Sequence, residues 1–101
     1  MGSREELHAV LENVLGSENV YFQPPSSVEM RYPAIVYSRS NIVNEHANNE
    51  VYIQNKSYEI TVIDRNPDSE IVDRISRISH CRFDRHFESD NLNHDVFTLY
   101  F

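Results

Sequence analysis

The segment Asn91-Leu-Asn-His-Asp-Val-Phe-Thr-Leu-Tyr-Phe101 decides the fold, because it is an apolar, strand-forming run at the end of the sequence. In a strand, alternate side chains point to opposite faces of the sheet. One set is Val96, Thr98 and Tyr100, and the other is Phe97, Leu99 and Phe101. Large side chains on both faces must both be covered. We therefore expect a strand that is central in its own sheet, or one whose second face is covered by another chain.

The composition is that of a folded domain. With 101 residues, 40% of them hydrophobic, the chain fits a single domain 1–101 with one core. The formal net charge of −7 argues against a surface that wraps nucleic acid, since that surface needs clustered Lys and Arg. The single cysteine, Cys81, excludes an internal disulfide and predicts a reducing compartment. The apolar runs are short, so no signal peptide or membrane span is expected.

Two segments have the spacing of amphipathic helices. The first runs from Ser3 to Leu15, with Ser3 as its cap and Gly16 as its stop. The second starts at Asn66, the predicted cap, and ends near Ser79. The apolar stripes are Leu7, Val10, Leu11, Val14 and Leu15 in the first helix, and Ile71, Val72, Ile75 and Ile78 in the second.

Extended segments are predicted at Met30–Ser38, at Tyr58–Ile63 and after Cys81. In the second of these, Tyr58, Ile60 and Val62 should face the core, and Ile63 should anchor the other face. Most connections between strands are too short for crossovers, so antiparallel pairing is expected. The predicted fold is α+β, with a small antiparallel β-sheet flanked by two α-helices.

A long polar arm is predicted around residues 39–57, rich in asparagine and partly stranded. A solvated loop and an arm ordered against a neighbouring subunit explain this composition equally well. The candidate subunit-interface residues come from this arm and from the terminal strand. They are Asn41, Asn44, Asn48, Val51, Tyr52, Phe97, Leu99, Tyr100 and Phe101.

Catalytic, metal-binding and cofactor-binding motifs are not recognised in the sequence. The histidines lack metal-ligand spacing and are expected to be structural or on the surface: His8, His46, His80, His86 and His94. Cys81 could pair with a histidine as a nucleophile, but its alternation with Phe83 favours a small buried apolar residue. The acids around the second helix start could hold a cation, yet capping and the helix dipole explain them better: Asp64, Asp68, Glu70 and Asp73. We expect that the protein is not an enzyme and that it binds no cofactor.

Four segments, in order, carry a likeness to one family: Val20–Pro25, Met30–Tyr37, Tyr58–Ser69 and Asp90–Tyr100. Together they resemble the tail completion, or tail-to-head joining, proteins of long-tailed bacteriophages. The likeness extends from about Leu7 to the last residue, with Ala34 where the family pattern has cysteine.

The resemblance implies a tail-terminator-like fold whose subunits close into a ring, commonly a hexamer, at the phage neck. The implied partners are further copies, a head-side connector or stopper protein, and the tail tube protein, while DNA only passes through the lumen. The implied location is the virion, after assembly in the host cytoplasm. Independently, a ring subunit needs two different side surfaces, which the terminal strand and the arm could supply. The negative net charge suits a lumen that repels phosphates.

Two alternatives stay open. One is a small intracellular α+β adaptor that binds a peptide along a sheet edge. The weaker one is a hydrolase that uses the carboxylates near Asp64 with His80 or His86.

Overall fold

The described residues form two helices and five strands. The computed structural model describes the backbone of residues 3–47 and 50–101, and the side chains of all of these except 41–55. The elements are α1 (Arg4–Leu15), β1 (Val20–Phe22), β2 (Ala34–Ala47), β3 (Glu50–Asp64), α2 (Glu70–Ser76), β4 (Cys81–Ser89) and β5 (Leu92–Tyr100). The α+β class predicted from the sequence is therefore confirmed.

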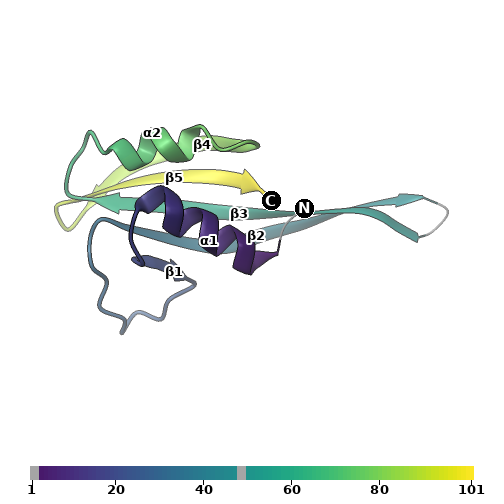
Figure 1. The fold of residues 1–101 in the computed structure, drawn as a ribbon, viewed down its shortest axis with the longest axis horizontal. Coiled ribbons are helices and arrows are strands. Elements are labelled where there is room, and N and C mark those ends of the chain that lie inside the picture. The colour runs from purple at the N-terminus through teal and green to yellow at the C-terminus, as the bar shows by residue number, and fades with distance from the viewer. Residues whose placement is uncertain (1–2, 48–49) are drawn as a thin grey trace.

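The strands make one sheet in the order β1-β2-β3-β5-β4 (Figure 1). The terminal strand β5 lies inside this sheet, between β3 and β4. Ile60 of β3 is paired with Phe97 of β5, and Tyr58 with Leu99. Of the two possibilities for the terminal strand, the position inside the chain's own sheet is the one observed.

The prediction of an entirely antiparallel sheet is wrong, because β1 pairs with β2 in parallel. The other three pairings are antiparallel, so the sheet is mixed. The connection of residues 23–33 between β1 and β2 carries the chain back past β1 before β2 begins. A run as short as Val20–Phe22 has too few residues to show a strand period, which is why the sequence did not identify it as a strand.

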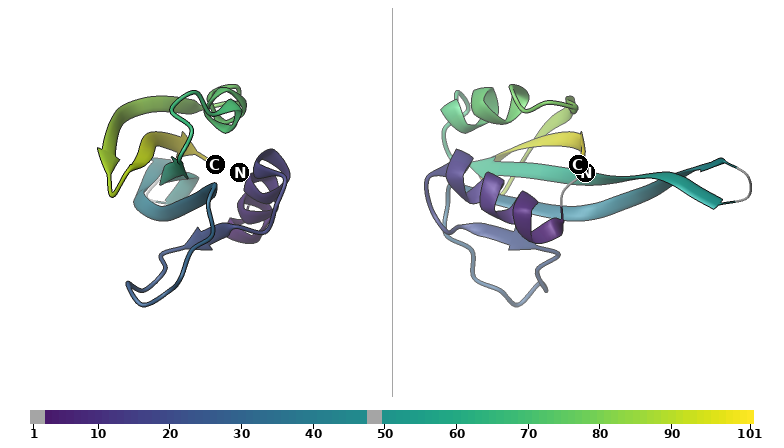
Figure 2. Two further views of the ribbon diagram at one scale, coloured as in Figure 1. Left: turned by 90° about the vertical axis from the view of Figure 1, so that its left-hand side faces the viewer. Right: turned by 45° about the vertical axis from the view of Figure 1, so that its right-hand side comes forward.

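Both helices cover the same face of the sheet (Figure 2). The core between helices and sheet contains leucines of α1, isoleucines of α2 and one side-chain set from each central strand. These residues include Leu7, Leu11, Ile71, Ile75, Ile35, Tyr37, Tyr58, Ile60, Val62, Phe97 and Leu99. The predicted alternation of β3 is confirmed, and Ile63 is buried on the opposite face.

The helix ends show which capping signals were correct. Ser3 caps α1 and forms a capping box with Glu6, while Gly16 closes the helix in the left-handed region, at φ 81°. The second helix differs from the prediction: Ser69, not Asn66, is its cap, and the helix ends at Ser76. The side chain of Asn66 instead accepts a hydrogen bond from the Asp68 backbone N–H in the preceding turn.

Beyond the body of the sheet, β2 and β3 continue as a projecting hairpin (Figure 1). Backbone pairing runs from Asn41 opposite Ser57 to Ala47 opposite Glu50. Strand β2 therefore starts at Ala34, later than the predicted start at Met30, and it extends far past the predicted end at Ser38. The hairpin makes the molecule elongated, with extents of 51 × 27 × 23 Å. We call residues 41–55 the arm.

Buried side chains in the sheet and in the helices predict a large loss of stability when they are shortened to alanine. Ile60 and Ile75 are fully buried, so Ile60→Ala and Ile75→Ala should each lower the free energy of unfolding by about 2–5 kcal/mol. Urea denaturation measures this change. Val28→Ala serves as the control, because Val28 is exposed and its change should be within about 0.5 kcal/mol. Equal midpoints for all three variants would contradict the core assignment.

Candidate subunit interfaces

The two faces of the terminal strand have different environments. Phe97 and Leu99 are fully buried in the core of their own subunit. The prediction that these two side chains lie at a subunit interface is therefore wrong, because no surface of either remains for a partner. Tyr100 is 45% exposed, and Phe101 is partly buried against the core. Of the terminal-strand candidates, these last two stay accessible.

The arm candidates are described only by their backbone. Asn41 and Asn44 belong to β2, where Asn44 is paired with Gln54. Val51 and Tyr52 belong to β3. Asn48 lies outside the described residues. The partner strand β5 ends opposite Ser57, so in the described pairing the arm is two-stranded. It projects as a separate surface from the body (Figure 1).

A surface that the sequence analysis did not single out lies along β4. This strand pairs with β5 on one side, and no described strand pairs with its other side. Its residues from Arg82 to Ser89 are all exposed, including Phe83 at 51% and Phe87 at 41%. Exposed aromatic residues on an open strand edge are typical of a site that receives a partner. We call Cys81–Ser89 with these two rings the β4 edge.

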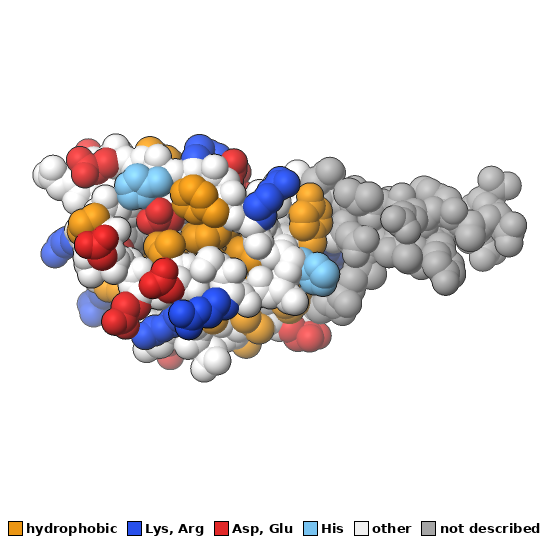
Figure 3. Space-filling view, turned by 90° about the horizontal axis from the view of Figure 1, so that it is seen from above, with side chains coloured by type: hydrophobic (Ala, Val, Ile, Leu, Met, Phe, Trp, Pro, Cys, Tyr) orange, Lys and Arg blue, Asp and Glu red, His pale blue; other side chains and the backbone are white. Residues whose placement is uncertain are grey.

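On the helix side, the β4 edge continues into an apolar surface beside α2. The Phe83 ring packs edge-on against Phe97, with 5.6 Å between ring centroids. Cys81, Val72 and Ile78 are partly buried against the same core. Seen from the side of α2 and β4, hydrophobic side chains gather in the middle of this face (Figure 3). The core is thus left incompletely covered here.

On the other face of the sheet, the β4 edge is polar and ordered by local contacts. Phe87 stacks on His94 with 4.6 Å between ring centroids. Arg85 pairs with Asp84 at 2.7 Å and with Glu59 at 3.9 Å. Charged side chains on an edge strand discourage indiscriminate strand pairing. The two faces of the β4 edge therefore differ. Phe83 offers an apolar contact on the helix side, and Arg85 places a charge on the other side.

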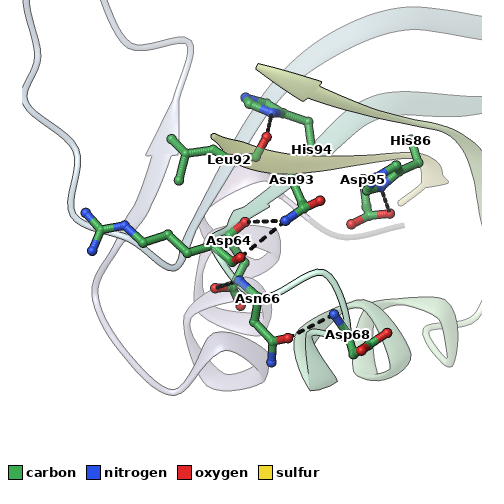
Figure 4. A network of polar contacts seen from close by, with 9 residues as sticks. Asp64, Asn66, Asp68, His86, Leu92, Asn93, His94 and Asp95 are labelled. Carbon is green, nitrogen blue, oxygen red and sulfur yellow. Dashed lines mark hydrogen bonds and ion pairs between the residues drawn. The ribbon is translucent and has the colours of Figure 1, made fainter. Parts of the chain in front are cut away.

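The carboxylates near the start of α2 lie around a small recess of about 220 Å³, lined by Asp68, Asp73 and Asp95 with Pro67, Ser69 and Val72. His86 is hydrogen-bonded to Asp95, with 2.8 Å between Nδ1 and Oδ1 (Figure 4). Ser69 is buried, and its hydroxyl accepts the Ile71 N–H as the cap of α2. Among the described residues, no group of three or more His, Cys, Asp or Glu side chains could hold a metal ion.

The remaining predicted acids and histidines do not converge on this recess. The side chain of Asp64 accepts the Asn66 N–H, and Glu70 pairs with Arg74 on the surface of α2. His8 contacts the Tyr37 hydroxyl at 2.7 Å, and His94 contacts the Leu92 carbonyl. His80 precedes β4 with φ 63°. His46 lies in the arm, among residues whose side chains are not described.

Cys81 is partly buried at the start of β4 and shares a face with Phe83, as its alternation predicted. Burial raises the pKa of the Cys81 thiol above its usual range. The group is therefore held in the neutral form, which is a poor nucleophile.

Scans against protein-family models and against curated proteins find no match to this chain. Among the described residues, neither helix is long and apolar enough to cross a membrane.

The central position of β5 predicts that its last residues are needed for folding. Deletion of Leu99–Phe101 removes a fully buried leucine and should cost several kcal/mol of stability, about 2–5 for Leu99 alone. Tyr100→Ala is the matched control, since its exposed side chain should leave the fold intact. Thermal melting followed by circular dichroism compares the truncated chain with the Tyr100→Ala variant. A truncated chain that melts like the full chain would contradict the assignment of β5 to the core.

Partial burial and the raised pKa predict slow alkylation of Cys81. At pH 8, the native chain should react with a thiol reagent at least about tenfold more slowly than the urea-unfolded chain, because unfolding both exposes the sulfur and restores the ordinary thiolate fraction. The rate of absorbance change with an aromatic disulfide measures this ratio. Equal rates in both states would contradict it.

Proposed function

We propose that this chain is a non-enzymatic structural protein of a phage virion. It acts at the neck, where it completes the tail tube and joins the tail to the head connector as a ring, and it is tail-terminator-like in fold. Its partners are other copies of itself, the head-side connector or stopper protein and the tail tube protein. The proposal starts from the ordered resemblance of four sequence segments to tail completion proteins.

The observation that supports the proposal is that one chain has two unlike surfaces available for contacts. The β4 edge offers an open strand with the exposed ring of Phe83. The arm projects from the far ends of β2 and β3, away from that edge (Figure 1). Two different surfaces on one chain support heterologous contacts, and heterologous contacts close into rings when the rotation between copies allows it.

The β4 edge also favours a second candidate, the peptide-binding adaptor. An extended peptide could add to the open side of β4 through backbone hydrogen bonds and place an apolar side chain against Phe83. Both candidates use the same edge, so the nature of the occupant distinguishes them. In a ring it is another subunit, whereas in an adaptor it is a segment of an unrelated protein.

A negative charge placed on the β4 edge should prevent assembly but leave folding intact. In the phage that encodes this chain, Phe83→Asp should leave filled heads and unattached tails, because loss of an aromatic anchor costs about 2 kcal/mol or more in each contact. Electron microscopy of lysates and infectious titre measure the effect. Circular dichroism of the purified variant verifies that it folds.

Val28→Asp is the matched control, since Val28 is exposed but lies in the connection between β1 and β2. It should give normal particles. Normal head–tail joining by a folded Phe83→Asp chain would exclude the β4 edge as a ring contact. If that chain had also lost binding to an extended peptide, the adaptor would be favoured.

A further inference from the structure

A pocket of about 250 Å³ lies where the arm meets the body of the domain. It is lined by Arg4, Phe22, Gln23, Arg39, Lys56 and Tyr58. Arg39 comes from β2 and Lys56 from β3, while Arg4 is the first residue of α1. Three cationic side chains from three separate elements therefore converge on one cavity. We call it the basic pocket.

The basic pocket contrasts with the rest of the chain. It holds three of the nine Lys and Arg residues, and no carboxylate is among the described residues that line it. Removing these three charges from the formal net charge of −7 leaves −10 for the rest. Among the described side chains, neither Arg39 nor Lys56 is paired with a carboxylate. Arg4 contacts Glu5 at 3.7 Å. A backbone hydrogen bond and the charges of Arg4 and Lys56 lower the pKa of Glu5, so one exposed carboxylate lies beside the pocket.

Contacts order the Arg4 side chain and the backbone beside Arg39. The guanidinium of Arg4 lies over the Phe22 ring, 4.6 Å from its centroid. The Gln23 side chain accepts the Arg39 backbone N–H at 3.4 Å, which ties the end of β1 to β2. Tyr58 is almost fully buried and forms part of the apolar wall.

The opposite end of the domain carries an acidic turn. There β3 ends at Asp64, paired with Asn93 next to the β4–β5 turn, whereas the basic pocket lies at the arm end of the same strands. The β4–β5 turn carries Glu88 and Asp90, both exposed. Asp90 and Asn91 have φ of 54° and 63°, as in a tight hairpin turn. The acidic group is thus presented on a convex tip.

We propose that the basic pocket binds the acidic β4–β5 turn, Glu88–Asn91, of a second copy of this chain. The inference rests on the proposed function and names one contact within that ring. A convex carboxylate tip fits a concave cationic pocket, whereas Asp68 and Asp73 line a recess of their own. The turn presents a local pair of negative charges, which complements the three cations of the pocket. The contact joins unlike surfaces, as a ring requires.

Lys56 is the only lysine of the chain, which makes a direct test possible. A carbodiimide joins an amine to a carboxylate in direct contact as an amide, and the reagent takes up the water. The full chain is mixed in equal amounts of ¹⁴N and ¹⁵N forms and treated at high concentration, and peptides are identified by mass spectrometry. We expect mixed-isotope peptides that link Lys56 to Glu88 or Asp90.

The double variant Glu88→Gln, Asp90→Asn should lower this yield about tenfold, while Asp84→Asn, on the same strand, should leave it unchanged. Lys56→Arg should abolish the link but keep assembly, because the positive charge remains. No mixed-isotope link, or a link only to Glu5 of the same chain, would overturn the inference. DNA binding lost in Arg39→Glu, with cross-linking unchanged, would also overturn it.

The test separates this contact from the proposed function. If virion rings form normally with Lys56→Glu, the pocket is not a ring contact, but the neck function stands. If head–tail joining does not depend on the chain at all, the neck function fails whatever the cross-linking result.

Discussion

The pairing of β3 with β5 is the constraint on which the rest of this structure depends. Ile60 and Phe97 face each other in this pair, and so do Tyr58 and Leu99. All four side chains point to the helix-covered face and are almost completely buried. Burial of such large apolar groups is the main favourable term in the folding of a small domain. Slipping this pair by one residue would turn the whole set to the opposite face.

With β5 in the interior, β4 becomes an edge by necessity. Its one neighbour is β5, and α2 is only seven residues long. The short helix leaves part of the face beside Phe83 uncovered, so the ring of Phe83 covers Phe97 from one side and meets solvent on the other. A stable core and an accessible apolar edge therefore follow from the same strand order.

Charge is arranged along the length of the domain. Long strands carry Arg39 and Lys56 to the arm end, while the β4–β5 turn and the connection before α2 bring carboxylates to the other end. The net charge of the chain does not reveal this distribution, because acidic residues outnumber basic ones over the whole chain. The local distribution of charge decides which charged groups this surface can attract, since screening limits charge interactions to about 8–10 Å in physiological salt.

The sequence by itself determined the elements whose signals are local. Ser3 and Gly16 marked α1 because capping involves neighbouring backbone groups, and the alternation of Tyr58–Ile63 identified the buried face of β3. Large side chains on both faces of Val96–Phe101 predicted that both faces of this strand must be covered.

Only the tertiary structure decided how each face is covered. Phe97 and Leu99 are buried in the chain's own core, whereas on the other face Val96 is buried and Tyr100 stays 45% exposed. The parallel pairing of β1, the exposed β4 edge and the basic pocket were equally beyond the sequence. Each depends on residues far apart in the chain, such as Arg4, Arg39 and Lys56. Their meeting is set by strand order and register, which no local pattern encodes.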